Sequence, residues 1–325
     1  MTVFLGVDGG GTKTAFCLLS DRGEVVAEHV AGGSYHWALG LDGAAKVIRD
    51  GVRDVCSLAG VSPGEVAYAF LGLPGHGESR DLLPVLDAIP AAVLGHDRYR
   101  CGNDMVCAWA GSLGARDGIT VVGGTGSMAY GEHGGARARA GGWGEVFGDE
   151  GSAHWIGVRG LGAFARMSDG RLPCGSLHPL FRERLGLTED LDLVDLVLTR
   201  WAGRRAEVAA VAPLVTEAAA RGDGVAAGIL RDAGGQLADV ASAVRRHLGH
   251  GPGETVPISW SGGVFSAGPV LAAFGQALAD LDAGYDLRAP LYPPAVGAAL
   301  YAARLAGTPL DPGAAGRLVT VGAVL

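Results

Sequence analysis

Lysine and runs of positive charge are nearly absent from this sequence. The 325 residues include 26 Lys and Arg against 34 Asp and Glu, for a formal net charge of -8, and Lys13 and Lys46 are the only lysines. The other cations are scattered arginines. Nucleic acid and anionic membrane surfaces attract clustered basic side chains, so neither is expected as a partner.

Long apolar runs and paired cysteines are also missing. No run approaches the roughly 20 apolar residues that a membrane span needs, and the first apolar strand starts at once without a basic leader, which predicts a cytoplasmic protein. The five cysteines form no C-x-x-C pair and lie mostly in apolar segments, so we expect reduced core thiols rather than a disulfide framework. They are Cys17, Cys56, Cys101, Cys107 and Cys174.

What is present indicates a two-lobed globular α/β protein. Hydrophobic residues make up 48% of the chain and charged residues 18%, and single cores stop growing near roughly 250–300 residues. Short apolar segments separated by tight turns predict an antiparallel meander over residues 2–31. After a loop over residues 32–40, alternating helices and strands complete the first lobe; they are predicted at residues 42–59, 66–73, 79–88, 99–102 and 104–113.

A second meander starts after residue 118, which suggests a duplicated fold. We therefore divide the chain into a first lobe of residues 1–115, joined by the C-terminal part from about 290 to 325, and a second lobe of residues 116–289. In the second lobe and the C-terminal part, strands are predicted at residues 119–122, 128–132, 136–140, 256–260 and 285–287, and helices at 152–167, 191–201, 206–220, 225–248, 269–280 and 294–305.

The first turn carries a glycine-rich segment that predicts a phosphate-binding loop. It runs Asp8-Gly9-Gly10-Gly11-Thr12-Lys13 between two strands, where glycines admit close approach and successive N–H groups can cradle a phosphate. It is neither a Walker A loop nor a Rossmann fingerprint, since no helix follows. A plain hairpin is the alternative, but it leaves the carboxylate at the strand end unexplained; Asp8 is predicted to hold Mg²⁺ through water.

Three motifs in order resemble the superfamily of sugar kinases, actin and heat-shock chaperones. They are the segment above, Gly123-Gly124-Thr125-Gly126-Ser127, and Ser259-Trp260-Ser261-Gly262-Gly263. The resemblance implies a duplicated actin-like (ribonuclease H-like) fold with a central cleft that binds ATP and Mg²⁺. The residues implied in ATP binding are Asp8, Gly9, Gly10, Gly11, Thr12, Lys13, Gly124, Thr125, Gly126, Gly262 and Gly263.

The run Gly141-Gly142-Trp143-Gly144, with residues 148–156 after it, resembles N-acetylglucosamine kinases and the related BadF/BadG/BcrA/BcrD-type ATPases. The resemblance covers nearly the whole chain and is weak between residues 165 and 250. It implies a homodimeric, ATP-dependent amino-sugar kinase that phosphorylates the 6-hydroxyl of N-acetylglucosamine. Glucosamine and N-acetylmuramic acid are alternative acceptors.

By the same resemblance, Asp104 is the catalytic base, which takes the proton of the sugar hydroxyl as the oxygen attacks the γ-phosphoryl. An N-cap role for Asp104 is the alternative. The substrate-binding set implied is Tyr35, His36, Asn103, Asp104, Ser127, Gly142, Trp143, Gly144 and Asp149. The alternative role of Asp149 is that of a helix N-cap, and the alternative role of His36 is packing within its loop.

Tyr35 departs from the family pattern, which has an Asn that contacts the sugar at this position before His-Trp. Because hydrogen-bonded recognition of a hydroxyl discriminates more strongly than shape, the departure bears on the choice of sugar rather than on the reaction. Tyr35 could instead stack on a sugar face.

Two other functions of the same fold are less well supported. An ATPase that activates a dehydratase would need cysteine ligands for an iron–sulfur cluster, and Cys101 and Cys107 do not have the expected spacing. A sugar-responsive regulator would carry a DNA-binding helix-turn-helix ahead of the first strand, which here is predicted to begin at residue 2.

Overall fold

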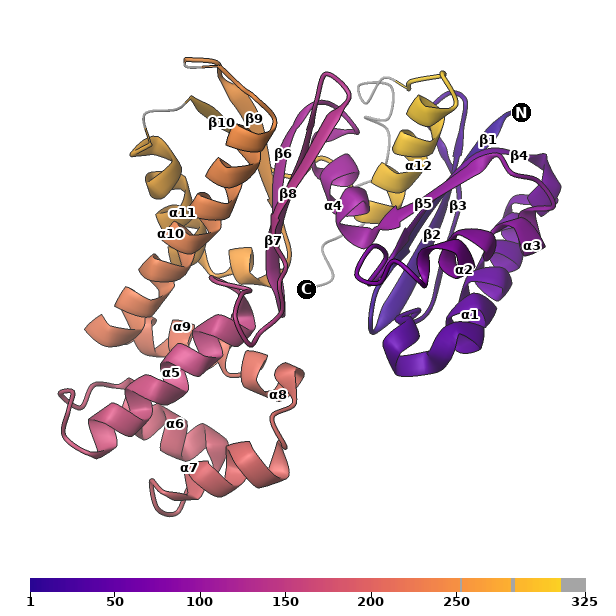
Figure 1. Cartoon of the computed structure of the whole chain (residues 1–325). Coiled ribbons are helices and arrows are strands. Elements are labelled where there is room, and N and C mark those ends of the chain that lie inside the picture. The colour runs from indigo at the N-terminus through magenta and orange to yellow at the C-terminus, as the bar shows by residue number, and fades with distance from the viewer. Residues whose placement is uncertain (252, 282–283, 311–325) are drawn as a thin grey trace. The chain divides into compact units, whose positions relative to one another are not determined.

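The computed structural model describes residues 1–251, 253–281 and 284–310 (Figure 1). The chain folds into two compact units. Unit 1 contains Met1–Arg116 and the chain from Ala289 onward, and unit 2 contains Asp117–Arg288. That these units are also independent domains, divided near residue 115, stays a prediction; the part of the predicted C-terminal segment after residue 310 lies outside the described residues.

Unit 1 is built on a mixed five-stranded sheet. The strand order is β3-β2-β1-β4-β5, with β2 antiparallel to β1 and β3, and β4 parallel to β1 and β5. The central strand β1 is a nearly continuous apolar run, as expected for a strand covered on both faces. The strands are β1 (Val3–Gly9), β2 (Lys13–Ser20), β3 (Val25–Gly32), β4 (Val66–Leu73) and β5 (Tyr99–Asn103).

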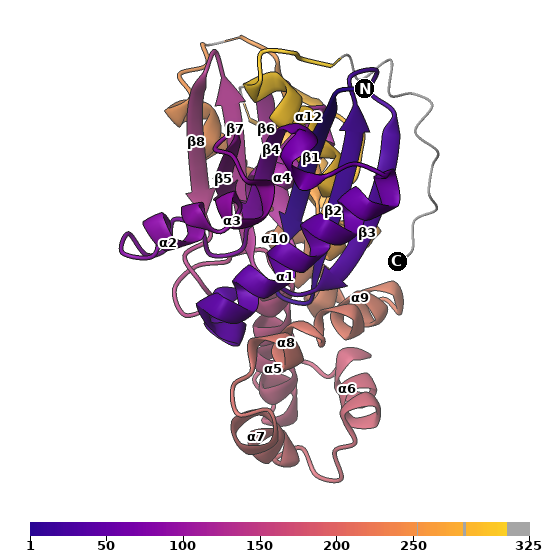
Figure 2. The ribbon, with the colours of Figure 1, turned by 90° about the vertical axis from the view of Figure 1, so that its right-hand side faces the viewer.

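Helices cover both faces of this sheet (Figures 1 and 2). Helix α1 (His36–Ala59) packs Gly51 against the ring of Phe16 on one face. On the other face, α12 (Pro294–Leu305) crosses β1 where Gly6 has no side chain, and it packs closely on α4 (Asp104–Leu113). The remaining helices of unit 1 are η1 (Pro63–Glu65), α2 (Leu83–Ala88) and α3 (Ala91–Leu94).

Unit 2 repeats the topology of unit 1. Its sheet has the order β10-β9-β6-β7-β8, so a central strand again pairs with an antiparallel meander on one side and with parallel strands on the other. The predicted duplicated actin-like fold is therefore confirmed. The strands are β6 (Gly118–Gly123), β7 (Ser127–His133), β8 (Ala136–Gly141), β9 (Val256–Ser261) and β10 (Tyr285–Leu287).

The helices of unit 2 form a second core with this sheet, centred on buried side chains such as Ile119, Phe164, Leu237 and Phe274. Within the described ranges, no helix of the chain is both long enough and apolar enough to span a bilayer. The helices are α5 (Ala153–Ser168), α6 (Leu177–Leu185), α7 (Asp192–Asp195), the π-helical segment η2 (Leu196–Arg200), α8 (Arg205–Ala209), α9 (Ala212–Ala220), α10 (Gly224–His247), η3 (Gly263–Ser266) and α11 (Gly268–Ala279).

Several predicted elements differ from the structure. Helix α1 begins at His36 rather than at residue 42, because a short first turn joins it across Gly40, whose φ of 72° breaks the helical pattern. Helix α6 was not predicted. The helices predicted at residues 79–88, 191–201 and 206–220 are shorter or interrupted.

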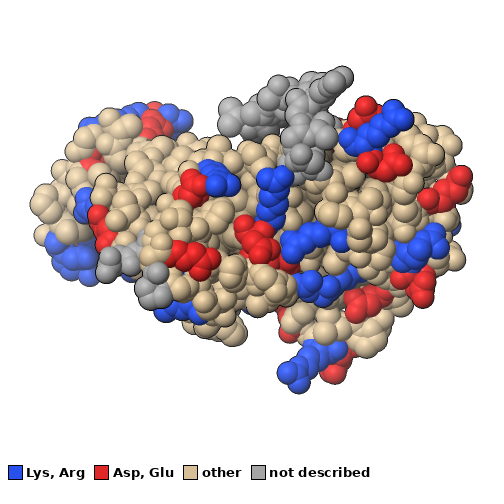
Figure 3. Space-filling model, turned by 90° about the horizontal axis from the view of Figure 1, so that it is seen from above, with Lys and Arg blue, Asp and Glu red and all other residues tan. Residues whose placement is uncertain are grey.

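Charges of both signs are mixed on the surface. On the face in Figure 3, Lys and Arg side chains lie among Asp and Glu and form no continuous basic surface.

The five cysteines are free; Cys17, Cys56 and Cys107 are buried and Cys101 is partly buried. The core prediction is wrong for Cys174, which is exposed.

Candidate active site

The predicted first phosphate loop is the turn between β1 and β2. The neighbouring chain braces it, since the N–H of Ser34 donates to the carbonyl oxygen of Gly10 at 2.9 Å. A Cβ on Gly9 would lie 2.7 Å from the carbonyl oxygen of Gly72, so only glycine fits there. Gly11, Thr12 and Lys13 are exposed. The turn therefore offers a backbone of small residues, with one cation, to an anionic ligand.

Asp8 and Asp104 lie at the carboxyl edge of the parallel strands of unit 1. Asp8 pairs with Gly72 of β4, and a Cβ on Gly72 would lie 3.0 Å from the backbone of Asp104. Burial first, and then the charge of Asp104, raises the pKa of Asp8 to about 7, against the opposing charge of Lys13. Burial, with a smaller contribution from Glu78, raises the pKa of Asp104 to about 6, although backbone hydrogen bonds oppose the shift.

The N-cap of α4 is Asn103 rather than Asp104. The Oδ1 of Asn103 accepts from the N–H of Met105 at 3.1 Å, and its Nδ2 donates to the carbonyl oxygen of His76 at 3.4 Å. Asp104 occupies the first helical position, where its Oδ1 also accepts from Met105 at 3.1 Å. The alternative that Asp104 is itself the cap is wrong, and the carboxylate benefits from the positive end of the helix.

Tyr35 and His36 lie beside the turn that follows β4. A Cβ on Gly75 would lie 2.9 Å from the ring of His36, 3.1 Å from that of Tyr35 and 3.3 Å from the carboxylate of Glu78. His36 is 5% exposed and packs between the rings of Tyr35 and Trp37. Because Glu78 also acts on the pKa of Asp104, this turn links the predicted sugar-binding side chains to the predicted base. Glu78 was not identified from the sequence.

The predicted second phosphate loop joins β6 to β7 in unit 2. Its carbonyl oxygens accept hydrogen bonds from the start of α5: Ala153 N–H donates to Gly124 at 2.9 Å and His154 N–H to Thr125 at 3.4 Å. The Oγ of Ser127 donates to the carbonyl oxygen of Glu150 at 2.6 Å. These hydrogen bonds fix the loop against the start of α5.

Asp149 is buried beside this loop and is paired with Arg205. It is 3% exposed, has a φ of 58°, and its Oδ1 accepts from the N–H of Ser127 at 3.4 Å. The Nη2 of Arg205 bonds the other oxygen, and its Nη1 lies 3.5 Å from Glu145. The helix N-cap alternative for Asp149 is wrong, because Ser152 caps α5 by accepting from Trp155.

Arg205 was also not identified from the sequence. A Cβ on Gly126 would clash with its guanidinium and would lie 2.7 Å from Asp149 Oδ2. A cation fixed against a phosphate loop suits a transferring phosphoryl group, which carries charge on its equatorial oxygens. No local pattern marks Arg205 among 24 arginines, since 56 residues of chain separate it from Asp149.

The segment predicted to form a pocket wall leaves β8 through two glycines with positive φ. Gly142 has a φ of 70° and donates to the carbonyl oxygen of Ser127 at 2.9 Å, and Gly144 has a φ of 89°. Between them, Trp143 is 67% exposed, with the guanidinium of Arg139 6.0 Å from its ring. Val146 and Phe147 are exposed as well, so this segment presents apolar surface on which a sugar ring can pack.

Gly262 brings the predicted adenosine motif against the second phosphate loop. It follows β9 with a φ of 97°, and a Cβ there would clash with the carbonyl oxygen of Gly123 and lie 3.1 Å from the N atom of Gly124. Gly263 begins η3 and is exposed. Two motifs more than 130 residues apart in sequence therefore meet in unit 2.

Comparisons with known proteins agree with this arrangement. The chain is 30% identical over 270 residues to an N-acetyl-D-glucosamine kinase of Dictyostelium discoideum, covering 80% of this chain and 85% of that one. It is 30% identical over 239 residues to an N-acetylmuramic acid/N-acetylglucosamine kinase of Clostridium acetobutylicum, covering 73% and 77%.

Among solved structures, a protein of Chromobacterium violaceum provisionally named an N-acetylglucosamine kinase superposes with a TM-score of 0.70 at 27% identity, covering 92% of this chain and 98% of that one. The family model of the BadF/BadG/BcrA/BcrD ATPases matches residues 5–302. With a match of that length, and with both hairpin loops and the duplicated sheet in place, the chain belongs to the BadF/BadG/BcrA/BcrD ATPase family.

Proposed function

We propose that this protein is an ATP-dependent amino-sugar kinase that transfers the γ-phosphoryl group of MgATP to the 6-hydroxyl of N-acetylglucosamine. The observation that carries the proposal is Asp104, a partly buried carboxylate at the start of α4 with a pKa raised to about 6, near Asp8 at the carboxyl edge of the unit 1 sheet. Relatives named as amino-sugar kinases support the same reaction class.

In the proposed reaction, the Asp104 carboxylate accepts the proton of the sugar hydroxyl while that oxygen bonds to the γ-phosphorus. The bond from this phosphorus to the bridging oxygen breaks, and ADP leaves with the electron pair. The residues implied in ATP binding are proposed to hold the phosphates, and Arg205 is proposed to stabilise the charge that develops on the transferring group. Positioning and charge stabilisation supply most of the rate.

Asp8 is the residue that fits a magnesium ion. Burial first, and then the like charge of Asp104, disfavour an ionised Asp8. A divalent cation would offset this cost, and oxygen ligands suit Mg²⁺. When bound, the ion would neutralise charge on the phosphates. Asp8 is proposed to hold it through water.

The sugar is proposed to contact Asn103, Asp149 and Ser127, with the segment around Trp143 and the rings of Tyr35 and His36 contributing packing. Tyr35 replaces an amide that would read a hydroxyl, so glucosamine and N-acetylmuramic acid remain the acceptors to compare with N-acetylglucosamine. We also propose a cytoplasmic homodimer, for which light scattering after gel filtration would give twice the mass of the chain.

The test is ADP release with MgATP across glucose, glucosamine, N-acetylglucosamine, N-acetylmannosamine and N-acetylmuramic acid. Asp104→Asn is run beside Asp50→Asn, which changes a partly exposed acid on α1 that pairs with Lys46. We expect one strong acceptor, loss of at least 100-fold in kcat for the first variant with nucleotide binding retained, and normal turnover for the second. Hydrolysis that is independent of every sugar would contradict the kinase proposal.

A further inference from the structure

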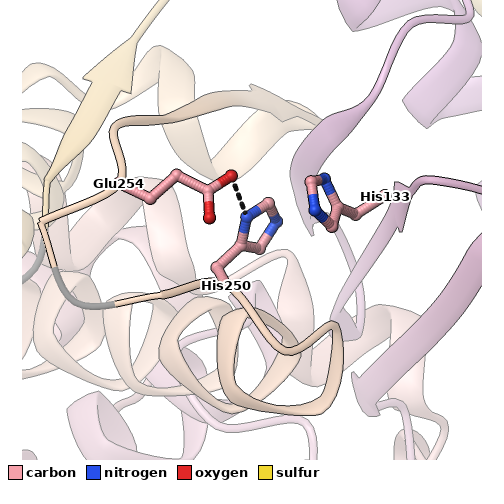
Figure 4. Close-up of side chains that lie close together, drawn as sticks. All are labelled: His133, His250 and Glu254. Atoms are coloured by element: carbon pink, nitrogen blue, oxygen red, sulfur yellow. Dashed lines mark hydrogen bonds and ion pairs between the residues drawn. The ribbon is translucent and has the colours of Figure 1, made fainter.

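Two histidines and a glutamate meet at a place in unit 2 that the proposed reaction does not use. His133 ends β7, His250 follows α10, and Glu254 precedes β9. Each of the three offers one metal-ligating atom, and these atoms all lie within 4.8 Å of one another. Figure 4 shows the His250 ring lying between the carboxylate of Glu254 and the ring of His133.

His250 is held by Glu254 in a way that leaves one ring nitrogen open. Its Nδ1 lies 2.7 Å from Oε1 of Glu254, and because an ionised carboxylate only accepts, that nitrogen carries the proton. The lone pair then sits on Nε2, which is buried and has no hydrogen-bond partner in the described part of the chain. The side chain of His250 is only 3% exposed. A buried acceptor without a donor is costly, and a cation would satisfy it.

His133 supplies the second imidazole. Its ring centroid lies 4.1 Å from that of His250, with 43° between the planes, and its side chain is 41% exposed. The Nδ1 of His133 lies 3.9 Å from Oδ2 of Asp117, too far for a hydrogen bond, whereas the Nδ1 of His250 is hydrogen-bonded to Glu254. Metal-bound histidines commonly have such a carboxylate behind them, because it orients the ring and raises the basicity of the ligating nitrogen.

We propose that His133, His250 and Glu254 form a binding site for a divalent cation of the zinc class. Imidazole nitrogens select Zn²⁺, Co²⁺, Ni²⁺ or Cu²⁺ over Mg²⁺ and Ca²⁺, which prefer oxygen ligands. The site is therefore distinct in chemistry from the magnesium site at Asp8. Glu254 holds the tautomer of His250 and supplies negative charge that offsets the cation, and water completes the coordination.

A cation bound here would stabilise unit 2. It would tie the end of β7 to the loop between α10 and β9, two segments more than 110 residues apart in sequence. A ligand that binds only the folded state raises its stability in proportion to the logarithm of free ligand over Kd. Zinc should therefore raise the melting temperature of the protein in the absence of ATP and sugar.

The experiment uses untagged full-length protein stripped with a chelator and titrated calorimetrically with ZnCl₂. We expect one ion per chain, at least tenfold weaker binding for His133→Ala and His250→Ala, and 10- to 100-fold weaker binding for Glu254→Gln. His247→Ala is the matched control, because His247 is an exposed histidine at the end of α10; it should bind as wild type does. MgCl₂ should give no heat that is lost in the His133→Ala variant, because imidazole ligands do not favour Mg²⁺.

His250 is buried, so its variant can lose binding through misfolding. The partly exposed His133 keeps the test decisive, with circular dichroism confirming that its variant folds. A wild-type chain that binds no zinc, or a folded His133→Ala variant that binds zinc as tightly as wild type, would overturn the proposal. With Co²⁺ in place of zinc, visible absorption bands that disappear in the His133 variant would support ligation by this residue.

Discussion

Asp8 and Asp104 share one edge of the unit 1 sheet, and the charge of Asp104 is second only to burial in raising the pKa of Asp8 to about 7. Ionising both carboxyl groups is therefore unfavourable without a cation nearby. A base that must be ionised to act will lose activity as it is protonated.

The first prediction concerns pH. If Asp104 is the base, kcat/KM should fall about tenfold for each pH unit below its pKa of about 6 and should level off above it. The pH dependence of kcat/KM is measured from initial rates between pH 4.5 and 8.5, with folding checked at each pH. Activity that is constant between pH 7 and pH 5 would exclude Asp104 as the group that titrates.

The second prediction is that Asp104→Asn stabilises the protein without ligands at neutral pH. The folded-state pKa lies above the ordinary value, so the folded state holds the proton more tightly and wild-type stability decreases as pH rises from about 4 to about 6. Above pH 6 the ionised Asp104 lowers the free energy of unfolding by the full amount, of the order of 1–3 kcal/mol. In urea unfolding, the free energy of unfolding of the variant should exceed that of the wild type at pH 8 but not at pH 4.

The third prediction concerns Gly262→Ala. The new Cβ would clash with the carbonyl oxygen of Gly123 at a φ of 97° that alanine disfavours, so the second phosphate loop must shift. We expect at least a tenfold rise in KM for ATP, with a smaller change in KM for the sugar. Gly268→Ala is the control, since nothing lies within 4 Å of a Cβ there. Equal nucleotide affinity for the two variants would contradict the prediction.

The fourth prediction concerns the partner of Asp149. In Arg205→Ala, the buried carboxylate of Asp149 loses its counter-charge, and the proposed phosphoryl site loses its cation. We expect kcat/KM to fall 100-fold or more, and Arg205→Lys to restore little because a lysine lacks the forked guanidinium. Arg204→Ala removes a neighbouring, exposed arginine that pairs with Glu207 and should keep nearly full activity. The measurement is kcat/KM of the three variants; equal values for Arg205→Ala and Arg204→Ala would contradict the prediction.

The fold could be predicted from local sequence because the residue types in its turns, above all glycine, indicate the turns directly. Gly9 and Gly262 are glycines for reasons visible in the structure, and the repeated hairpins indicated the duplication. Glu78 and Arg205 could not be found this way, because their approach to Asp104 and Asp149 depends on how distant segments pack. The start of α1 was missed because Gly40 interrupts the periodicity, and α6 because arginines and a proline lie among its apolar residues.

The return of the chain to unit 1 has a consequence for how the protein is made. Helix α12 is buried from Ala295 to Ala303 and packs against β1 and α4, which precede unit 2 in the chain and are synthesised before it. A ribosome must therefore complete all of unit 2 before it synthesises α12. Until then β1 lacks its packing against α12, whereas the elements of unit 2 form one continuous stretch that can fold as it emerges.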